Sequence, residues 1–324
     1  MNIDNLQLWS DTALVRTASN KAVTASEQQA INAKREQTFN MYFNSPDGLK
    51  RIAFAMTAPL KTRLDYVGIG RKLLMVDTIP AGEIPFYDLD MPEFGAVKIA
   101  ARGQAPVFEQ AIKRITIPTF EVTVNEVIKK MELSVRRYDV FNRGKERVAI
   151  AMAIAEDDLV FELVDSAVKH QTAQYTTYGA SATDYVRKAD FATMLGKIAE
   201  KQLIAKTYLL GARTQADLLK WDSNDLDQVS LNIQLETGNF GSIFGVRTVV
   251  STRLDQVVNK LDNTVKQPIF ALTTPDKLGR IPERKAVEVS IFDNIPKLQY
   301  DILGYEILGM SIYNIGGVEG IKHA

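Results

Sequence analysis

The spacing of apolar residues predicts one long central helix. Over residues 143–170, apolar side chains recur every three or four positions, which is the spacing of a helix face. One stripe contains Val148 and Leu159, and a second contains Ile150 and Phe161. Residues 148 and 150 lie about 200° apart around a helix. We therefore expect this helix to be buried on two opposed faces, as a central strut would be.

Strand-like alternation of apolar and polar residues surrounds this helix. Residues 114–124 alternate, but the apolar parity changes across Pro118-Thr119, which predicts a long strand interrupted by a bend. Further strands are predicted at 206–210, 231–235, 243–251, 269–272, 287–291, 298–302 and 305–313. Because the strands do not alternate regularly with helices, the predicted fold class is α+β.

Proline and glycine are concentrated in residues 77–103, directly after a predicted strand at 73–76. The strand-like pieces at 84–87 and 96–100 are interrupted by too many of these residues to be core strands. The segment therefore predicts a projecting hairpin.

The N-terminal segment is polar and weakly periodic. We expect residues 1–46 to form an arm that cannot fold alone, with short helical turns at 27–31 and 39–43. A short amphipathic helix is predicted at 48–56, ending before Pro59 because a proline disfavours helical geometry in the preceding residue.

Composition narrows the classes of function. The 324 residues contain 39 Lys and Arg and 39 Asp and Glu. The net charge of zero argues against a dedicated nucleic-acid binder or a polybasic membrane-surface protein, and it permits self-association. With no cysteine and only His170 and His323, the chain has no disulfide, thiolate metal site, cysteine nucleophile or multi-histidine site. No apolar run is long enough for a membrane span and no secretory signal is evident, so we expect a cytoplasmic origin.

Two segments carry opposite charge. The predicted hairpin contains five acids and no base from Leu73 to Val97: Asp77, Glu83, Asp88, Asp90 and Glu93. Residues 129–147 carry a net charge of +4, with seven bases: Lys129, Lys130, Arg136, Arg137, Arg143, Lys145 and Arg147. The acids form either a solvated loop or a docking surface, and the bases contact either phosphate or the acids of another copy. Contact between copies uses both features, so we favour it.

Catalytic motifs are not evident. The chain has no P-loop, GxSxG or HExxH sequence. Glu156-Asp157-Asp158 invites an acid–base or metal interpretation, but consecutive residues diverge by about 100° on a helix. We expect these acids to form a solvated or subunit-pairing face, and we predict no catalytic, cofactor-binding or metal-binding residue.

Several segments, in their order along the chain, resemble the major capsid proteins of tailed bacteriophages. They are residues 117–122, 136–143, 156–158, 242–251, 279–284 and 303–314. Together they cover most of residues 70–315.

This resemblance implies the phage major capsid fold. Such a fold has an N-terminal arm, an extended hairpin called the E-loop, a peripheral or P-domain with a long spine helix, and an axial or A-domain. The expected segments are the arm at 1–46, a short helix and connection at 47–72, the E-loop at 73–112, the P-domain at 113–172, the A-domain at 173–285, and return strands with the C-terminus at 286–324.

The resemblance also implies a function. The protein is expected to form hexamers and pentamers of an icosahedral virion shell around packaged double-stranded DNA, after assembly in the host cytoplasm. Expected partners are other copies of the chain, a separate scaffold protein, a portal, a possible decoration protein, and DNA through non-specific contact. The alternatives are an encapsulin-type compartment shell, which uses the same fold, and an α+β enzyme with an unrecognised carboxylate site.

Overall fold

The structure of the protein is a computed structural model. The structure describes residues 25–45, 47–80, 82–90, 112–134, 137–172, 176–178, 186–221, 241–263 and 265–323. Within these residues, no helix combines the length and the apolar character that crossing a membrane requires.

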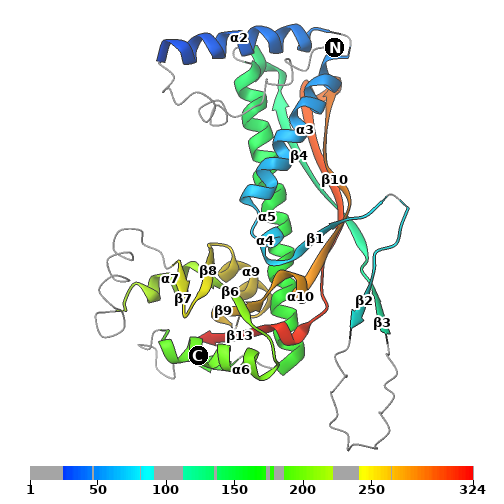
Figure 1. The fold of residues 1–324 in the computed structure, drawn as a ribbon. Helices are drawn as coiled ribbons and strands as arrows, with labels where there is room; N and C mark the ends of the chain where they lie inside the picture. Colours follow the sequence, from blue (N-terminus) through cyan, green and yellow to red (C-terminus); the bar gives the residue numbers. More distant parts are fainter. Residues whose placement is uncertain are drawn as a thin grey trace, which may run out of the picture.

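Helix α5 (Arg137–Thr172) runs through the whole molecule and joins an elongated upper region to a compact lower one (Figure 1). Its 36 residues span about 54 Å at 1.5 Å per residue. Val148 in its first half packs into one apolar core, and Phe161 and Val164 in its second half pack into another. The long helix predicted from the sequence is confirmed, with six more residues at its N-terminal end and two at its C-terminal end.

The two predicted stripes of α5 are not buried along their whole length. Ile150 is 42% exposed, and Leu159 is only partly buried. Phe161 is fully buried, as expected. The reason is that the two cores cover the helix at different heights, so each stripe is covered over only part of its length.

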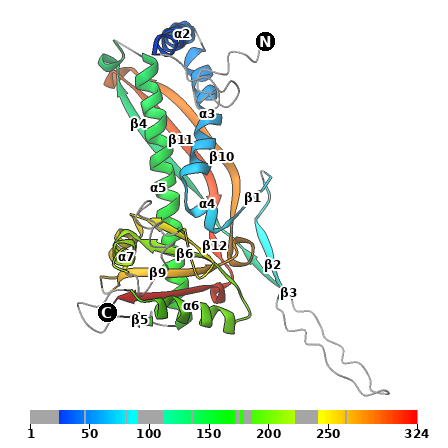
Figure 2. The ribbon, with the colours of Figure 1, turned by 60° about the vertical axis from the view of Figure 1, so that its left-hand side comes forward.

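The upper region is a long sheet covered by helices on one face. Its main strands follow the order β1 (Met75–Thr78), β10 (Gly279–Asn294), β11 (Gln299–Gly309) and β4 (Thr119–Lys129), and β12 (Ser311–Ile312) pairs with β10. β10 and β11 are antiparallel and are joined through η3 (Ile295–Lys297). Helices α5 and α3 (Gly48–Val67) lie against this sheet (Figure 2).

A two-stranded hairpin projects away from this sheet. β2 (Phe86–Asp90) pairs antiparallel with β3 (Ile112–Thr116), with Asp88 opposite Arg114. Figure 2 shows the hairpin pointing outward from the body of the molecule. The predicted break at Pro118 is confirmed, since β3 and β4 belong to different sheets.

The lower region contains a second sheet. Its strand order is β5 (Thr176–Tyr178), β13 (Val318–His323), β9 (Lys266–Thr273), β6 (Ala205–Gly211), β8 (Val246–Ser251) and β7 (Ser242–Ile243). Among its described residues, this region has the helices α6 (Lys188–Glu200), α7 (Ala212–Leu218), α9 (Leu254–Leu261) and α10 (Pro275–Leu278), and η4 (Ile315–Gly317) precedes β13. The strand predicted at 231–235 lies outside the described residues. The boundaries expected after residues 112 and 285 fall inside single strands, β3 and β10.

Two expectations for the N-terminal segments are wrong. Residues 25–43 form one helix, α2 (Ala25–Phe43), rather than two short turns, and its Phe39 is buried against Phe141 with ring centroids 5.3 Å apart. Helix α3 continues past Pro59. A proline removes one helical hydrogen bond, but Met56 and Leu60 on either side of it are fully buried in the upper core. Packing therefore outweighs the local preference.

Candidate functional site

A short helix, α4 (Gly70–Leu73), is fixed against the middle of α5. Oδ1 of Asp157 accepts hydrogen bonds from the backbone N–H groups of Ile69 at 2.8 Å and Gly70 at 2.6 Å. A Cβ on Gly70 would lie 2.8 Å from a methyl group of Val160. Only glycine allows this close approach, which sets the position of the next residue, Arg71.

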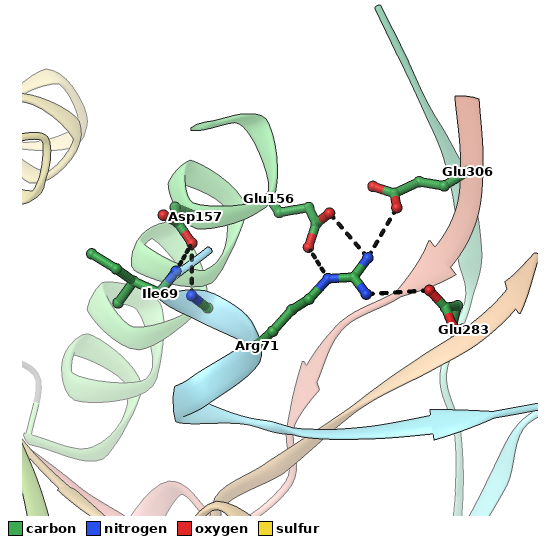
Figure 3. Close-up of polar contacts among 7 residues, drawn as sticks. Ile69, Arg71, Glu156, Asp157, Glu283 and Glu306 are labelled. Carbon is green, nitrogen blue, oxygen red and sulfur yellow. Dashed lines mark hydrogen bonds and ion pairs between the residues drawn. The ribbon is translucent and has the colours of Figure 1, made fainter. Parts of the chain in front are cut away.

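The guanidinium of Arg71 lies among three glutamates from three different elements (Figure 3). Its Nε and Nη2 donate to the two oxygens of Glu156 on α5, at 2.7 and 3.1 Å. Nη2 also donates to Oε2 of Glu306 on β11 at 3.0 Å, and Nη1 to Oε1 of Glu283 on β10 at 3.3 Å. All four side chains are at most 6% exposed. We call these four residues the Arg71 cluster.

Burial is the largest single influence on the pKa values of Arg71, Glu306 and Asp157. It lowers the pKa of Arg71, but the ion pairs with Glu156, Glu306 and Glu283 outweigh it and hold that pKa above the ordinary value. Burial, with the charge of Glu156 next in importance, raises the pKa of Glu306 to about 9. Burial also raises the pKa of Asp157 to about 6, against the opposing effect of the Gly70 and Ile69 hydrogen bonds.

The Arg71 cluster is suited to holding elements together rather than to chemistry. A catalytic or binding site must admit a substrate, whereas these side chains are closed off from solvent and bonded to one another. Among the described residues, no group of three or more potential ligands is arranged to hold a metal ion. The cluster instead joins α4, α5, β10 and β11 through a single cation.

The expectation that Glu156, Asp157 and Asp158 form a solvated or subunit-pairing face is wrong for the first two. Glu156 is 1% exposed and Asp157 is 9% exposed, and both have partners within the chain. Asp158 forms an ion pair with Arg253, whose Nε lies 2.8 Å from its Oδ1. Partners distant in the sequence, which the helical pattern cannot reveal, account for this difference.

For the predicted inter-subunit acids, the structure describes the side chains of Asp77 on β1, Glu83 between β1 and β2, and Asp88 on β2. Asp77 pairs with Arg280 at 2.6 Å, and Asp88 pairs with Arg114 across the hairpin at 2.9 Å. The side chain of Glu83 is exposed. Glu93 and the side chain of Asp90 lie outside what the structure describes.

The predicted inter-subunit bases do not form one continuous basic surface. Lys145 is buried, Lys130 pairs with Asp293 at 2.7 Å, and Arg147 pairs with Glu126 at 2.9 Å. Lys129 and Arg143 are exposed. Arg136 and the side chain of Arg137 lie outside what the structure describes.

Arg143 and Arg147 line a groove of about 430 Å³ together with Glu126 and Glu132. This surface therefore carries both signs of charge. The local net charge of +4 counted along the sequence overstates its basic character, because neighbouring strands contribute acids.

No protein-family model matches the sequence, and no curated protein matches it either. Solved structures do match. A structure from Microbacterium phage Oxtober96 aligns with a TM-score of 0.58 and 11% identity, covering 79% of this chain and 91% of that one. The capsid structure of cyanophage P-SCSP1u aligns with a TM-score of 0.56 and 14% identity, covering 79% and 88%. The chain has the phage major capsid fold.

A third match, the capsid of a native GTA particle, aligns with a TM-score of 0.51 and 13% identity, covering 78% of this chain and 89% of that one. We use the names of the phage major capsid fold as labels, with spine helix for α5, E-loop for the segment that begins with the β2–β3 hairpin, and A-domain for the lower region. Figure 3 shows Arg71 on α4 (light blue), which precedes β1, facing Glu156 on α5 (green).

Proposed function

We propose that the protein is a structural subunit of an icosahedral phage head and has no enzymatic activity. It assembles into hexamers and pentamers that enclose double-stranded DNA. The observation that supports this function is the fold itself, which aligns over about four fifths of the chain with solved phage capsids. Its location is the virion, after assembly in the host cytoplasm. Its partners are further copies of the chain, a scaffold protein, a portal and, where present, a decoration protein.

The projecting hairpin supports self-association. Its two strands pair only with each other among the described residues, and Ile84 and Phe86 on it are more than half exposed. An isolated two-stranded hairpin is marginally stable in water. Contact with a neighbouring copy would cover these apolar side chains.

Charge is the second proposed determinant of assembly. The acids Asp77, Glu83, Asp88, Asp90 and Glu93 lie over the 129–147 region of a neighbour, where Lys129, Arg143 and Arg147 are the exposed bases that the structure describes. Such pairs set register and association rate more than affinity.

Sedimentation velocity and electron microscopy of the purified full chain test the proposed function. We expect ring-shaped hexamers and pentamers, or closed shells, at micromolar concentration. A stable monomer under the same conditions would contradict the proposal. Nuclease-protected DNA in shells from infected cells supports a phage head, whereas shells without nucleic acid indicate a protein compartment.

A further inference from the structure

One oxygen in the Arg71 cluster has no donor. Glu306 is fully buried, and its Oε2 accepts from Arg71, but its Oε1 receives no hydrogen bond from any described group. The carboxyl group of Glu156 lies beside it, because Oε1 of Glu156 and Oε2 of Glu306 both accept from Nη2 of Arg71. Two ionised carboxylates repel each other, and neither carries a donor for the other. A proton on one of them removes the repulsion and supplies the missing donor.

The charges around Glu306 lead to the same conclusion. Arg71 faces it from α4, Glu156 from α5 and Glu283 from β10. On β4, the residue opposite Glu306 is the apolar Val122. Three ionised glutamates around one arginine would give a buried net charge of −2. Uncompensated buried charge is strongly destabilising, and one bound proton reduces the net charge to −1.

We propose that Glu306 and Glu156 share one proton at neutral pH, and that this proton locks the root of the E-loop hairpin to the spine helix. Strand β10 connects the Arg71 cluster to the segment just before the hairpin. Glu283 bonds to Arg71 through its side chain, and its backbone carbonyl accepts from the N–H of Ile79 at 2.9 Å, just before the hairpin. The next residue, Arg284, donates to the carbonyl of Glu83 at 2.6 Å.

Loss of the proton places two like charges in contact between β11 and α5. The ion pairs of Arg71 are then strained, and the hold on β10 and the hairpin root weakens. Since the pKa of Glu306 is raised to about 9, the lock holds at neutral pH and opens in mildly alkaline solution. The inference concerns the subunit itself and does not depend on the proposed function.

The effect of this proton on the free energy of unfolding has a defined direction. The ordinary pKa of a glutamate is 4.5, so between about pH 4.5 and 9 the folded chain holds a proton that the unfolded chain has released. The contribution of Glu306 to stability therefore declines as the pH rises through this window, and it is constant above the window. The variant Glu306→Gln cannot titrate, but its amide can still accept from Arg71 and donate to Glu156. It should become progressively more stable relative to the wild type between pH 6 and 9.

Urea unfolding of the full chain at several pH values tests this linkage. The matched control is Glu121→Gln, an exposed glutamate on β4 of the same sheet. We expect the midpoint difference between Glu306→Gln and the wild type to grow in favour of the variant as the pH rises, while Glu121→Gln follows the wild type. A difference that does not change with pH would overturn the shared proton.

Infrared spectroscopy of the wild type provides a test that needs no variant. A protonated carboxyl band should be present at pH 8, above the titration of ordinary carboxyl groups, and lost by about pH 10.5. Absence of the band at pH 8 would overturn the proposal.

Hydrogen exchange of a peptide covering residues 79–88 tests whether this proton holds the hairpin in place. We expect faster exchange in the wild type than in Glu306→Gln above pH 9 and equal exchange at pH 7, and equal exchange at both would overturn the link to the hairpin.

Discussion

Arg71 and Glu156 form a two-bond ion pair, at 2.7 and 3.1 Å, between residues 85 positions apart in the sequence. The pair connects the short helix before the E-loop to the middle of the spine helix. Both side chains are at least 94% buried, so the pair is inaccessible to salt. It contrasts with the Asp158–Arg253 pair on the same helix, whose side chains are 26% and 38% exposed.

Arg71→Leu should be severely destabilising. It leaves Glu156, Glu283 and Glu306 buried without their cation, and breaking a buried ion pair in this way costs about 3–5 kcal/mol. Urea unfolding at pH 7 measures the loss. Arg253→Leu is the matched control, because an exposed pair contributes about 0–1 kcal/mol. Equal losses in the two variants would contradict the role of the Arg71 cluster.

Asp157→Asn should change the pH dependence of stability below pH 6. The pKa of Asp157 is raised from 3.8 to about 6. The free energy of unfolding therefore decreases as the pH rises from about 4 to 6. Two pKa units correspond to about 2–3 kcal/mol. The asparagine oxygen can still accept from Ile69 and Gly70, but it does not titrate, so the decline should disappear. Exposed Asp139 on the same helix supplies the control variant Asp139→Asn, which should keep the wild-type profile in urea unfolding.

The elements of this fold that are local in sequence could be predicted from it. The spine helix follows from the 3.6-residue period over 143–170, and the break between β3 and β4 follows from the change of parity at Pro118. The passage of α3 through Pro59 could not be predicted, because it depends on the burial of Met56 and Leu60 by distant strands.

The Arg71 cluster could not be predicted for the same reason, because its four residues come from widely separated positions. One signal was available. In β11, the inward-facing positions are Ile302, Gly304, Glu306 and Leu308, so an acid stands where the alternation requires an apolar residue. An ionisable residue at a buried strand position predicts a buried partner. The sequence does not indicate which residue that partner is.

Gly211→Ala should destabilise the A-domain. Gly211 precedes α7, and a Cβ at this position would lie within bonding distance of Asp255 Oδ1, whose carboxylate accepts from the N–H of Arg213 at the start of α7. Relieving such a clash costs about 1–3 kcal/mol. Gly196→Ala in α6 is the control, since nothing lies within 4 Å of its Cβ. It should stabilise the chain by about 0.5–1 kcal/mol, and thermal unfolding measures both changes.

Phe161→Ala should test the buried side of the spine helix. Phe161 is fully buried in the lower core, and truncating such a side chain costs about 3–5 kcal/mol. Ile150→Ala, on the same predicted stripe but 42% exposed, should change stability by less than about 0.5 kcal/mol. If chemical unfolding shows similar losses of stability for Phe161→Ala and Ile150→Ala, the predicted stripe is buried along its whole length.

Reversing the charge of the hairpin should impair assembly. Asp88→Lys with Asp90→Lys removes acids that we propose to contact a neighbour, and adding Arg136→Glu with Arg137→Glu should partly restore assembly. Light scattering after dilution into assembly buffer measures the rate, which should also fall with added salt because exposed pairs are screened beyond about 8 Å at physiological ionic strength.

The ion pair between Asp88 and Arg114 makes a specific control necessary. Asp88→Lys places two like charges opposite each other across the hairpin, so slow assembly could reflect damage to the hairpin alone. The exchange Asp88→Arg with Arg114→Asp keeps this ion pair and the net charge of the hairpin, and we expect it to fold the hairpin normally. Suppose that the variant with Asp88→Arg and Arg114→Asp assembles at the wild-type rate, while the variant with Asp88→Lys and Asp90→Lys assembles more slowly. The slower assembly then results from the changed net charge of the hairpin. If the four-residue reversal rescues nothing, the bases face packaged DNA rather than the hairpin of a neighbour.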